Sequence, residues 1–271
     1  MAETIGIIAG GGQFPRLIAR EAHAAGLGVA ICGFQGHTDP ATLECADAAE
    51  MLHLGQLSRL ASFFLKNSVR RVCMAGTISK PRALDLRPDW RAAKLLLKVK
   101  KRGDDSLLRA IIADLETDGL SIVASADLAP ALRTPEGVLT RRKPTEKDWE
   151  AIRYGWPIAK SLGSWDIGQC IVVRENMVMA VECLEGTDAA IRRGAEVGGE
   201  GCVAIKIVKP GQDERVDLPS VGLATIENMT SLGYSALAIQ AQNTLFFDRQ
   251  QALDLADRKG LAVIALPLDF S

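Results

Sequence analysis

Short apolar runs alternate with amphipathic stretches through the first half of the chain. The apolar runs, each short enough for a buried strand, cover residues 5–9, 29–34, 69–75 and 120–124. The amphipathic stretches, which have helical spacing, cover residues 15–25, 57–67 and 107–117. Residues 47–54 show no clear period. Because strands that alternate with helices form parallel sheets, residues 1–130 are predicted to form a Rossmann-like, doubly wound α/β domain.

The pattern changes between residues 131 and 144. This segment carries prolines, a glycine and the basic run Arg141-Arg142-Lys143, which together are typical of a linker between domains. Thr145 and Asp148 then resemble a capping box, with Asp in place of the usual Glu or Gln. They predict a helix that begins there and runs to about residue 162.

Residues 145–271 again mix strand and helix patterns. Residues 169–173 and 177–183 predict a hairpin, because a short polar segment separates two apolar runs. Further strands are predicted at residues 202–208, 236–240, 244–247 and 261–266. Further helices are predicted at residues 187–197, within 218–232, and at 248–259. The hairpin and the alternating elements indicate a distinct C-terminal α/β domain with a mixed sheet.

Composition narrows the class of protein. The chain has 271 residues, of which 48% are apolar, so two cores can form. A net charge of −1 and only 5% aromatic residues argue against a nucleic-acid partner. No C-x-x-C or H-x-x-x-H pair occurs, which disfavours a disulfide framework or a zinc site. Without a basic leader or an apolar run of about 18 residues, a cytoplasmic protein is expected.

Gly10, Gly11 and Gly12 lie between a predicted strand and a predicted helix. Glycines let a backbone approach a phosphate closely, and a helix N-terminus attracts anions. The dinucleotide fingerprint is incomplete, because Pro15 replaces its third glycine and residues 29–36 contain no acid. The segment therefore predicts either an anion or nucleotide contact without NAD, or a tight turn that binds nothing.

A charged cluster follows the predicted strand that ends near residue 208. Lys206 and Lys209 precede a Pro-Gly turn, and Asp213, Arg215 and Asp217 follow it. Loops at strand ends often carry chemistry, because the sheet holds them in place. The pattern suits a metal–phosphate site, in which carboxylates hold a hard cation and basic groups neutralise phosphate charge. A solvated loop with incidental charges is the competing interpretation.

A second acidic segment contains Glu182, Glu185 and Asp188 within seven residues. Thr187 is placed to cap the following helix, and Asp188 to lie in its first turn. These are ordinary structural roles. The carboxylates nevertheless add to the supply of ligands for Mg²⁺, which needs only one or two of them and keeps waters.

Residues 91–102 read RAAKLLLKVKKR, in which six basic residues surround Leu95, Leu96, Leu97 and Val99. A basic amphipathic helix can rest on an anionic membrane surface. The alternative is an ordinary helix whose basic face is solvated.

Several of these segments together resemble the type-I UDP-2,3-diacylglucosamine pyrophosphatase family of lipid A synthesis. The matching segments are residues 6–15 (GIIAGGGQFP), Lys80-Pro81, Gly103-Asp104-Asp105, residues 166–169 (DIGQ), residues 185–188 (EGTD), and Lys209-Pro210-Gly211-Gln212-Asp213 with Arg215, Asp217 and Pro219. The resemblance runs nearly from end to end, and the Lys-Pro-Gly-Gln-Asp loop is its most specific part.

The resemblance implies an N-terminal nucleotide-binding-like domain and a C-terminal α/β domain that hold the substrate between them. It implies Mg²⁺-dependent (or Mn²⁺-dependent) hydrolysis of UDP-2,3-diacylglucosamine to UMP and 2,3-diacylglucosamine 1-phosphate (lipid X), with water attacking the β-phosphorus. A diacylated substrate would bring the protein to the inner face of the inner membrane as a transient surface contact. Homodimer formation stays open.

The resemblance also assigns site residues. Catalytic roles fall to Asp213, Asp217, Lys209 and Arg215. Metal ligation falls to Asp213, Asp217 and Asp188. Substrate contacts fall to Gly10, Gly11, Gly12, Gln13, Phe14, Lys80, Gln169, Thr187, Lys206 and Gln212. One aspartate is essential in the family, and Asp213 is favoured over Asp217 because it directly follows the turn and is nearer Lys209 in the chain.

Two other functions stay open on the sequence. One is a phosphohydrolase for a soluble nucleotide or sugar nucleotide. The other is a regulator that binds a nucleotide without hydrolysing it.

Overall fold

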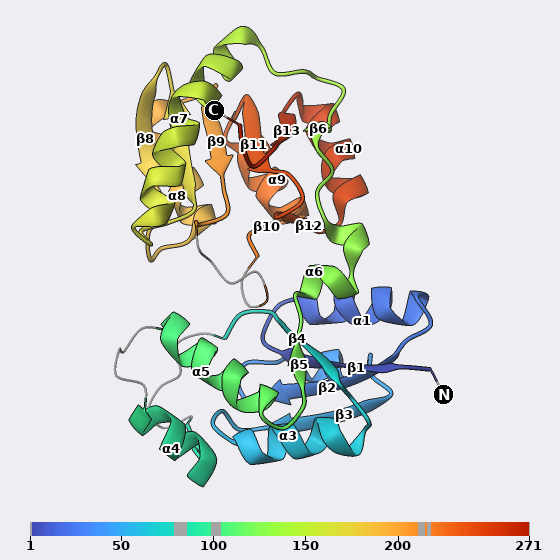
Figure 1. Ribbon diagram of the computed structural model, residues 1–271. Helices are drawn as coiled ribbons and strands as arrows, with labels where there is room; N and C mark the ends of the chain where they lie inside the picture. The colour runs from blue at the N-terminus through green and yellow to red at the C-terminus, as the bar shows by residue number, and fades with distance from the viewer. Residues whose placement is uncertain (1, 79–85, 99–103, 211–214, 216–217, 271) are drawn as a thin grey trace. The chain divides into compact units, whose positions relative to one another are not determined.

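The protein is described by a computed structural model of residues 2–78, 86–98, 104–210, 215 and 218–270. The chain divides into two compact units, Met1–Ala131 and Leu132–Ser271 (Figure 1). Each unit is described by itself below.

The first unit contains a five-stranded sheet in which all neighbours are parallel. The strands are β1 (Thr4–Ala9), β2 (Gly28–Phe34), β3 (Ala48–Leu52), β4 (Arg71–Ala75) and β5 (Ser121–Ile122), in the order β3-β2-β1-β4-β5. The helices are α1 (Phe14–Ala24), α2 (Pro40–Leu43), α3 (Leu57–Lys66), α4 (Trp90–Lys98), α5 (Asp104–Glu116) and α6 (Ser125–Leu128). This strand order confirms the predicted Rossmann-like, doubly wound sheet.

The burial of each strand explains whether the sequence pattern predicted it. Residues 5–9 of β1 and 29–34 of β2 are fully buried, so they appear as continuous apolar runs. β3 lies at the edge of the sheet, and only Leu52 in it is buried. An edge strand needs no continuous apolar run, which is why residues 47–54 gave no clear pattern.

The second unit contains a mixed six-stranded sheet, as predicted. Its strands are β6 (Gly137–Val138), β7 (Cys170–Arg174), β8 (Met177–Val181), β9 (Val203–Lys206), β11 (Ala236–Gln240) and β13 (Ala262–Leu266), in the order β6-β13-β11-β9-β7-β8. β13, β11 and β9 are parallel, β7 is antiparallel to β9, and β8 is antiparallel to β7. The strands β10 (Ser220–Val221) and β12 (Leu245–Phe246) form a separate parallel pair.

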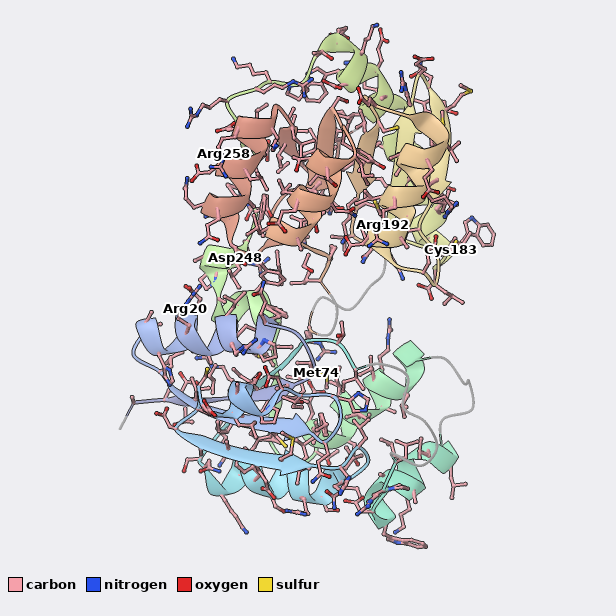
Figure 2. All side chains as sticks on the ribbon, turned by 180° about the vertical axis from the view of Figure 1, so that it is seen from behind. Arg20, Met74, Cys183, Arg192, Asp248 and Arg258 are labelled. Atoms are coloured by element: carbon pink, nitrogen blue, oxygen red, sulfur yellow. The ribbon has the colours of Figure 1, made fainter. Side chains whose placement is uncertain are left out.

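Helices cover both faces of this sheet. α7 (Glu146–Ser164) packs on one face through Ile152 and the fully buried Trp156. α8 (Thr187–Gly198), α9 (Leu223–Ser231) and α10 (Arg249–Lys259) contribute buried side chains to the core of the other face. The polar faces of these helices point outward, as Arg192 of α8 and Arg258 of α10 show (Figure 2).

Residues 132–144, most of the segment predicted as a linker, belong to the second unit. β6 within it pairs antiparallel with β13, and the buried Thr140 accepts a hydrogen bond from the Val263 amide at 2.9 Å. The capping box that follows is confirmed. The Thr145 hydroxyl accepts from the Asp148 amide, and the Asp148 carboxylate accepts from the Thr145 amide at 2.8 Å.

Candidate functional site

In the first unit, the carboxyl ends of β1 and β4 mark the point where the strand order reverses. Ligands of open α/β sheets bind outside the strand ends at this point. The Gly10–Gly12 segment follows β1, and Gly76 and Thr77 follow β4. Two backbone hydrogen bonds of 2.7 Å, from Gly10 to the Ala75 carbonyl and from Gly11 to the Thr77 carbonyl, join the loops.

The close approach of these loops explains why position 10 is a glycine. A Cβ on Gly10 would lie 2.6 Å from the Thr77 carbonyl oxygen, and one on Gly76 would lie 2.4 Å from the Gly11 oxygen. Because the Gly10 and Gly11 amides already bond to β4 and its loop, they have no N–H left for a phosphate. Gly12 differs, since it is exposed, has a φ of +85°, and immediately precedes Gln13, the N-cap of α1.

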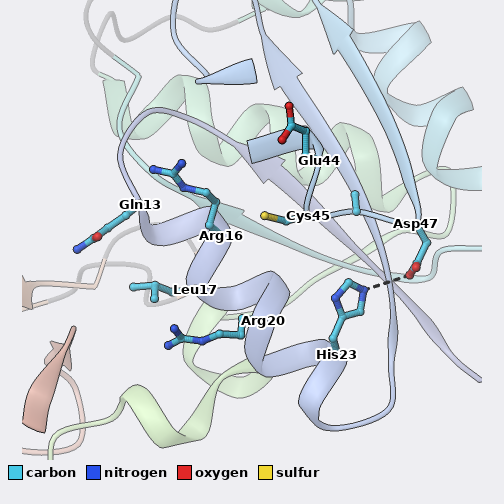
Figure 3. A pocket seen from close by; sticks show the side chains of 9 residues that line it. Gln13, Arg16, Leu17, Arg20, His23, Glu44, Cys45 and Asp47 are labelled. Carbon is cyan, nitrogen blue, oxygen red and sulfur yellow. Dashed lines mark hydrogen bonds and ion pairs between the residues drawn. The ribbon is translucent and has the colours of Figure 1, made fainter. Parts of the chain in front are cut away.

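Gln13 also lies at one end of an open pocket of about 650 Å³ beside α1 (Figure 3). Arg16, Arg20 and His23 line it from the same helix. At the other end, His23 lies 3.2 Å from the Asp47 carboxylate. The arginines of the pocket face acidic neighbours, since Arg16 lies 3.3 Å from Asp39 and Arg20 lies 3.8 Å from Glu21. Among the predicted substrate contacts that the structure describes in this unit, Gln13 lines the pocket and Gly10, Gly11, Gly12 and Phe14 do not.

In the second unit, the strand directions bring several predicted residues to one edge of the sheet. β8, β9, β11 and β13 all end there, and β7 begins there. The chain that leaves β8 leads to Thr187, and the chain that leaves β9 leads to Lys209. Residues far apart in sequence therefore meet at this edge.

A buried polar network lies on the α8–α10 side of this edge. Lys206, the last residue of β9, is only 6% exposed. Its ammonium donates to the Thr187 hydroxyl at 3.1 Å and to the Ser220 carbonyl at 2.8 Å. The Thr187 hydroxyl in turn donates to Oε1 of Glu182 at 2.8 Å, while Oε2 of Glu182 is buried without a partner among the described residues.

The charged groups of this network affect the pKa of Cys170, a thiol inside the sheet. Burial raises the pKa of the Cys170 thiol to about 12; the Lys206 ammonium opposes that shift, and the carboxylates of Glu182 and Asp188 add to it. Cys170 is therefore an inert, protonated core thiol. Two of the three N–H groups of Lys206 have acceptors among the described residues, which leaves the third for a further acceptor.

The predicted capping role of Thr187 is wrong. Gly186, with a φ of +82°, is the N-cap of α8, and the Thr187 hydroxyl bonds to Glu182. Asp188 does lie in the first turn, as expected, and its side chain is exposed. Its backbone carbonyl accepts a hydrogen bond from the Asn228 side chain at 3.3 Å.

On the α7 side of the same edge, amides hold the loop that follows β9. The Gln169 carbonyl accepts from the Ile207 amide, and Oε1 of Gln240 accepts from the Val208 amide. Oε1 of Gln169 is buried and has no partner in the described part of the chain. The Lys209 ammonium lies 2.8 Å from the exposed Asp166 carboxylate, so its charge is shared within the protein.

Four predicted site residues, Lys80, Gln212, Asp213 and Asp217, lie outside the described residues. Phe14 and Arg215 are described, and both are partly buried. Within residues 2–78, 86–98, 104–210, 215 and 218–270, no three His, Cys, Asp or Glu side chains gather as a metal site would require. Of the predicted ligands, Asp188 alone falls within these ranges.

Of the buried network, Ser220 was absent from the sequence-based prediction, and Glu182 was named only among the acids that could supply a metal ligand, with no role toward Lys206. Ser220 contributes only a backbone carbonyl, which no sequence pattern marks. Glu182 did carry a signal, because an acid directly after an apolar strand is a candidate at a sheet edge.

Comparison with known proteins agrees with the two-unit architecture. Residues 4–132 match the family model described as the LpxI N-terminal domain, and residues 135–264 match the LpxI C-terminal domain. The chain is 33% identical over 273 aligned residues to the UDP-2,3-diacylglucosamine pyrophosphatase LpxI of Caulobacter vibrioides, covering 97% of both chains.

Among solved structures, the chain has a weak likeness to phosphoribosylglycinamide synthetase from Anaerococcus prevotii. That likeness has 9% identity and a TM-score of 0.26, and covers 73% of this chain and 43% of the other. It has no bearing on function. The two domain matches and the full-length relative, by contrast, establish that the chain belongs to the LpxI family.

Proposed function

We propose that this chain hydrolyses the pyrophosphate bond of UDP-2,3-diacylglucosamine, giving UMP and 2,3-diacylglucosamine 1-phosphate. Water attacks the β-phosphorus, so the new oxygen enters the lipid product. The relation to a pyrophosphatase of that name over 97% of the chain supports the substrate. The buried Lys206 at the sheet edge is the structural observation that carries the chemistry, because it supplies a fixed positive charge for a phosphate.

Several residues of the second unit have distinct roles in the proposed reaction. The Lys206 ammonium, held by Thr187 and Ser220, neutralises charge that develops on the pyrophosphate. Lys209 and Arg215, from the loop after β9, add positive charge at the same edge. Gln169 offers a buried amide oxygen to a substrate hydroxyl. Asp213 or Asp217 orients the attacking water.

The donor set suits Mg²⁺, or Mn²⁺ in its place. Mg²⁺ takes one or two protein carboxylates and fills its remaining positions with water and phosphate oxygens. The exposed carboxylate of Asp188, with Asp213 and Asp217, would hold such an ion. When bound, the metal would polarise the phosphoryl group.

In the first unit, Gly12, Gln13 and Phe14 at the start of α1 would meet the nucleotide. The positive end of the helix dipole favours an anion there. Gly10 and Gly11 serve this contact indirectly, because their hydrogen bonds to β4 and its loop hold the turn in shape.

The test is UMP release from UDP-2,3-diacylglucosamine in ¹⁸O-labelled water, with and without Mg²⁺. Metal-dependent release with label in the lipid product is expected. Label in UMP would move the attack to the α-phosphorus. No release from a folded preparation, combined with turnover of UDP-glucose, would favour a soluble-substrate hydrolase; tight UMP binding without any turnover would favour a regulator.

We further propose that the protein works in the cytoplasm and touches the inner membrane through α4. No helix in the described part of the chain has both the length and the apolar character needed to cross a bilayer. Trp90 and Leu97 are seven residues, or about two turns, apart in α4, so their side chains lie on the same face of the helix. They are 76% and 87% exposed. Lys94 lies between them, with its ammonium 5.4 Å from the Trp90 ring centroid. Exposed aromatic, aliphatic and basic side chains on one face suit a membrane interface.

Arg91, by contrast, faces the protein. Its guanidinium donates hydrogen bonds of 2.6 Å to Asp114 of α5 and to Asp118 just after that helix. Arg91 therefore holds α4 against the rest of its unit and is unavailable to lipid. Flotation with vesicles containing anionic lipid should fall when Trp90 and Leu97 are both changed to Ser. The exposed Val197→Ser variant should float like the wild type, and equal flotation of all three would end the membrane proposal.

A further inference from the structure

The chain Lys206–Thr187–Glu182 has a direction that a hydroxyl group imposes. A threonine hydroxyl has a single proton, and Thr187 uses it to donate to Oε1 of Glu182 at 2.8 Å. Its lone pairs are then left for the Lys206 ammonium, 3.1 Å away. Because an ammonium can only donate, Thr187 accepts from Lys206 in any case, and the bond to Glu182 fixes the rotation of the hydroxyl so that a lone pair faces the ammonium.

This arrangement fixes the ammonium in space. Lys206 has three N–H groups, and two of them are directed to Thr187 and to the Ser220 carbonyl. Tetrahedral geometry then sets the direction of the third. No direct ion pair joins Lys206 to Glu182 or to any other carboxylate in the described residues, so its charge is not cancelled at contact distance.

The second carboxylate oxygen of Glu182, Oε2, has no hydrogen-bond partner among the described residues. The residue is 7% exposed, and its Oε2 is buried. A buried carboxyl oxygen that stays without a hydrogen bond is destabilising. Such a group fits a site in which a bound ligand completes the hydrogen bonding.

We infer that Glu182 is a positioning residue: through Thr187 it aims the third N–H of Lys206 at a phosphate oxygen, while its Oε2 accepts from a hydroxyl or amide donor of the same ligand. The ligand class is a sugar phosphate, which carries both groups. The inference rests on the proposed function for its substrate. The hydrogen bonds that it requires are present in the structure.

The first test is kinetic. Glu182→Gln keeps the shape of the side chain but removes the charge and replaces one acceptor by a donor. We expect kcat for UMP release to fall about tenfold or more with KM changed less than about threefold, since the aimed charge acts mainly in the transition state. Glu196→Gln, the same change at an exposed position of α8, should behave as the wild type. A wild-type kcat for Glu182→Gln would overturn the inference.

The second test reads the ammonium directly. Lysine-selective ¹⁵N labelling should show a slowly exchanging Nζ resonance, assigned by its loss in Lys206→Met. It should shift or broaden in Glu182→Gln and in Thr187→Val, and return in Thr187→Ser, which restores the hydroxyl. Reduced activity with an unchanged Lys206 resonance would mean that Glu182 does not act through Lys206, which also overturns the inference.

The two tests separate failure of this inference from failure of the proposed function. Inorganic phosphate, titrated into the wild type, should move the Lys206 resonance, and should move it less in Thr187→Val than in Thr187→Ser. This readout needs no lipid substrate. If Glu182→Gln does not fold, Glu182→Asp, which keeps the carboxylate but shortens its reach to the Thr187 hydroxyl, takes its place, and an unchanged Lys206 resonance in that variant would overturn the inference. An absent phosphate response in the wild type would refute the assigned ligand class.

Discussion

Replacement of Lys206 by Met separates catalysis from stability in this protein. The side chain is 6% exposed, and Met is similar in length but carries no charge and no donor. The change removes the hydrogen bonds from Nζ to Thr187 and Ser220. It leaves the bond between Thr187 and Glu182 in place, because Thr187 is the donor there.

The two expected effects differ in size. The Ser220 carbonyl loses its donor, which costs about 1–3 kcal/mol if it stays unpaired. Removing a buried ammonium saves desolvation energy of several kcal/mol, so the two stability terms oppose each other. Loss of a fixed charge at a transition state costs about 100- to 1,000-fold in kcat, or roughly 3–4 kcal/mol, with nothing to offset it.

We therefore expect Lys206→Met to lose most UMP release while its melting temperature stays within several degrees of the wild type. Steady-state kinetics with UDP-2,3-diacylglucosamine and a thermal melt on the same preparation measure both. Turnover within about threefold of wild type in a folded variant would refute the placement of the site at this edge. Activity that falls only in step with the folded fraction would assign Lys206 a structural role.

Three other predictions test the surrounding structure. Gly10→Ala should weaken UMP binding and lower stability, measured by calorimetry and thermal melts, because the new Cβ would lie 2.6 Å from the Thr77 carbonyl oxygen; unchanged binding would contradict the coupling of the two loops. The pKa of Asp47 is held below its ordinary 3.8, mainly by the hydrogen bond from the Val29 amide and to a lesser extent by the one from His23. The ionised carboxylate therefore stabilises the folded protein fully above pH 3.8, and this contribution is lost as the pH falls through the lower pKa of the folded state. The melting temperatures of wild type and Asp47→Asn should accordingly differ above about pH 4 and converge in more acidic buffer; a constant difference would argue against the linkage. Thr145→Ala should cost about 1 kcal/mol in urea unfolding through loss of the helix cap, and a change below about 0.3 kcal/mol would contradict it.

Local patterns account for most of the correct predictions. The buried runs of β1 and β2, the helical spacing of α3 and the capping box at Thr145 each depend on neighbours within a few residues. Where a strand lies at a sheet edge, as β3 does, half-exposed side chains remove that signal. The same reasoning fits β6, a two-residue edge strand inside the segment predicted as a linker.

The order of residues along the chain was enough to predict the two α/β units, the family resemblance and the segments in which charged residues gather. The contacts of Lys206 with Thr187 and of Thr187 with Glu182 could be found only once the chain was folded. These contacts depend on β7 lying between β9 and β8 and on α8 following β8, an order that hydrophobic periodicity does not encode. Periodicity reports which face of an element is buried, whereas strand order and direction determine which side chains meet at the end of the sheet.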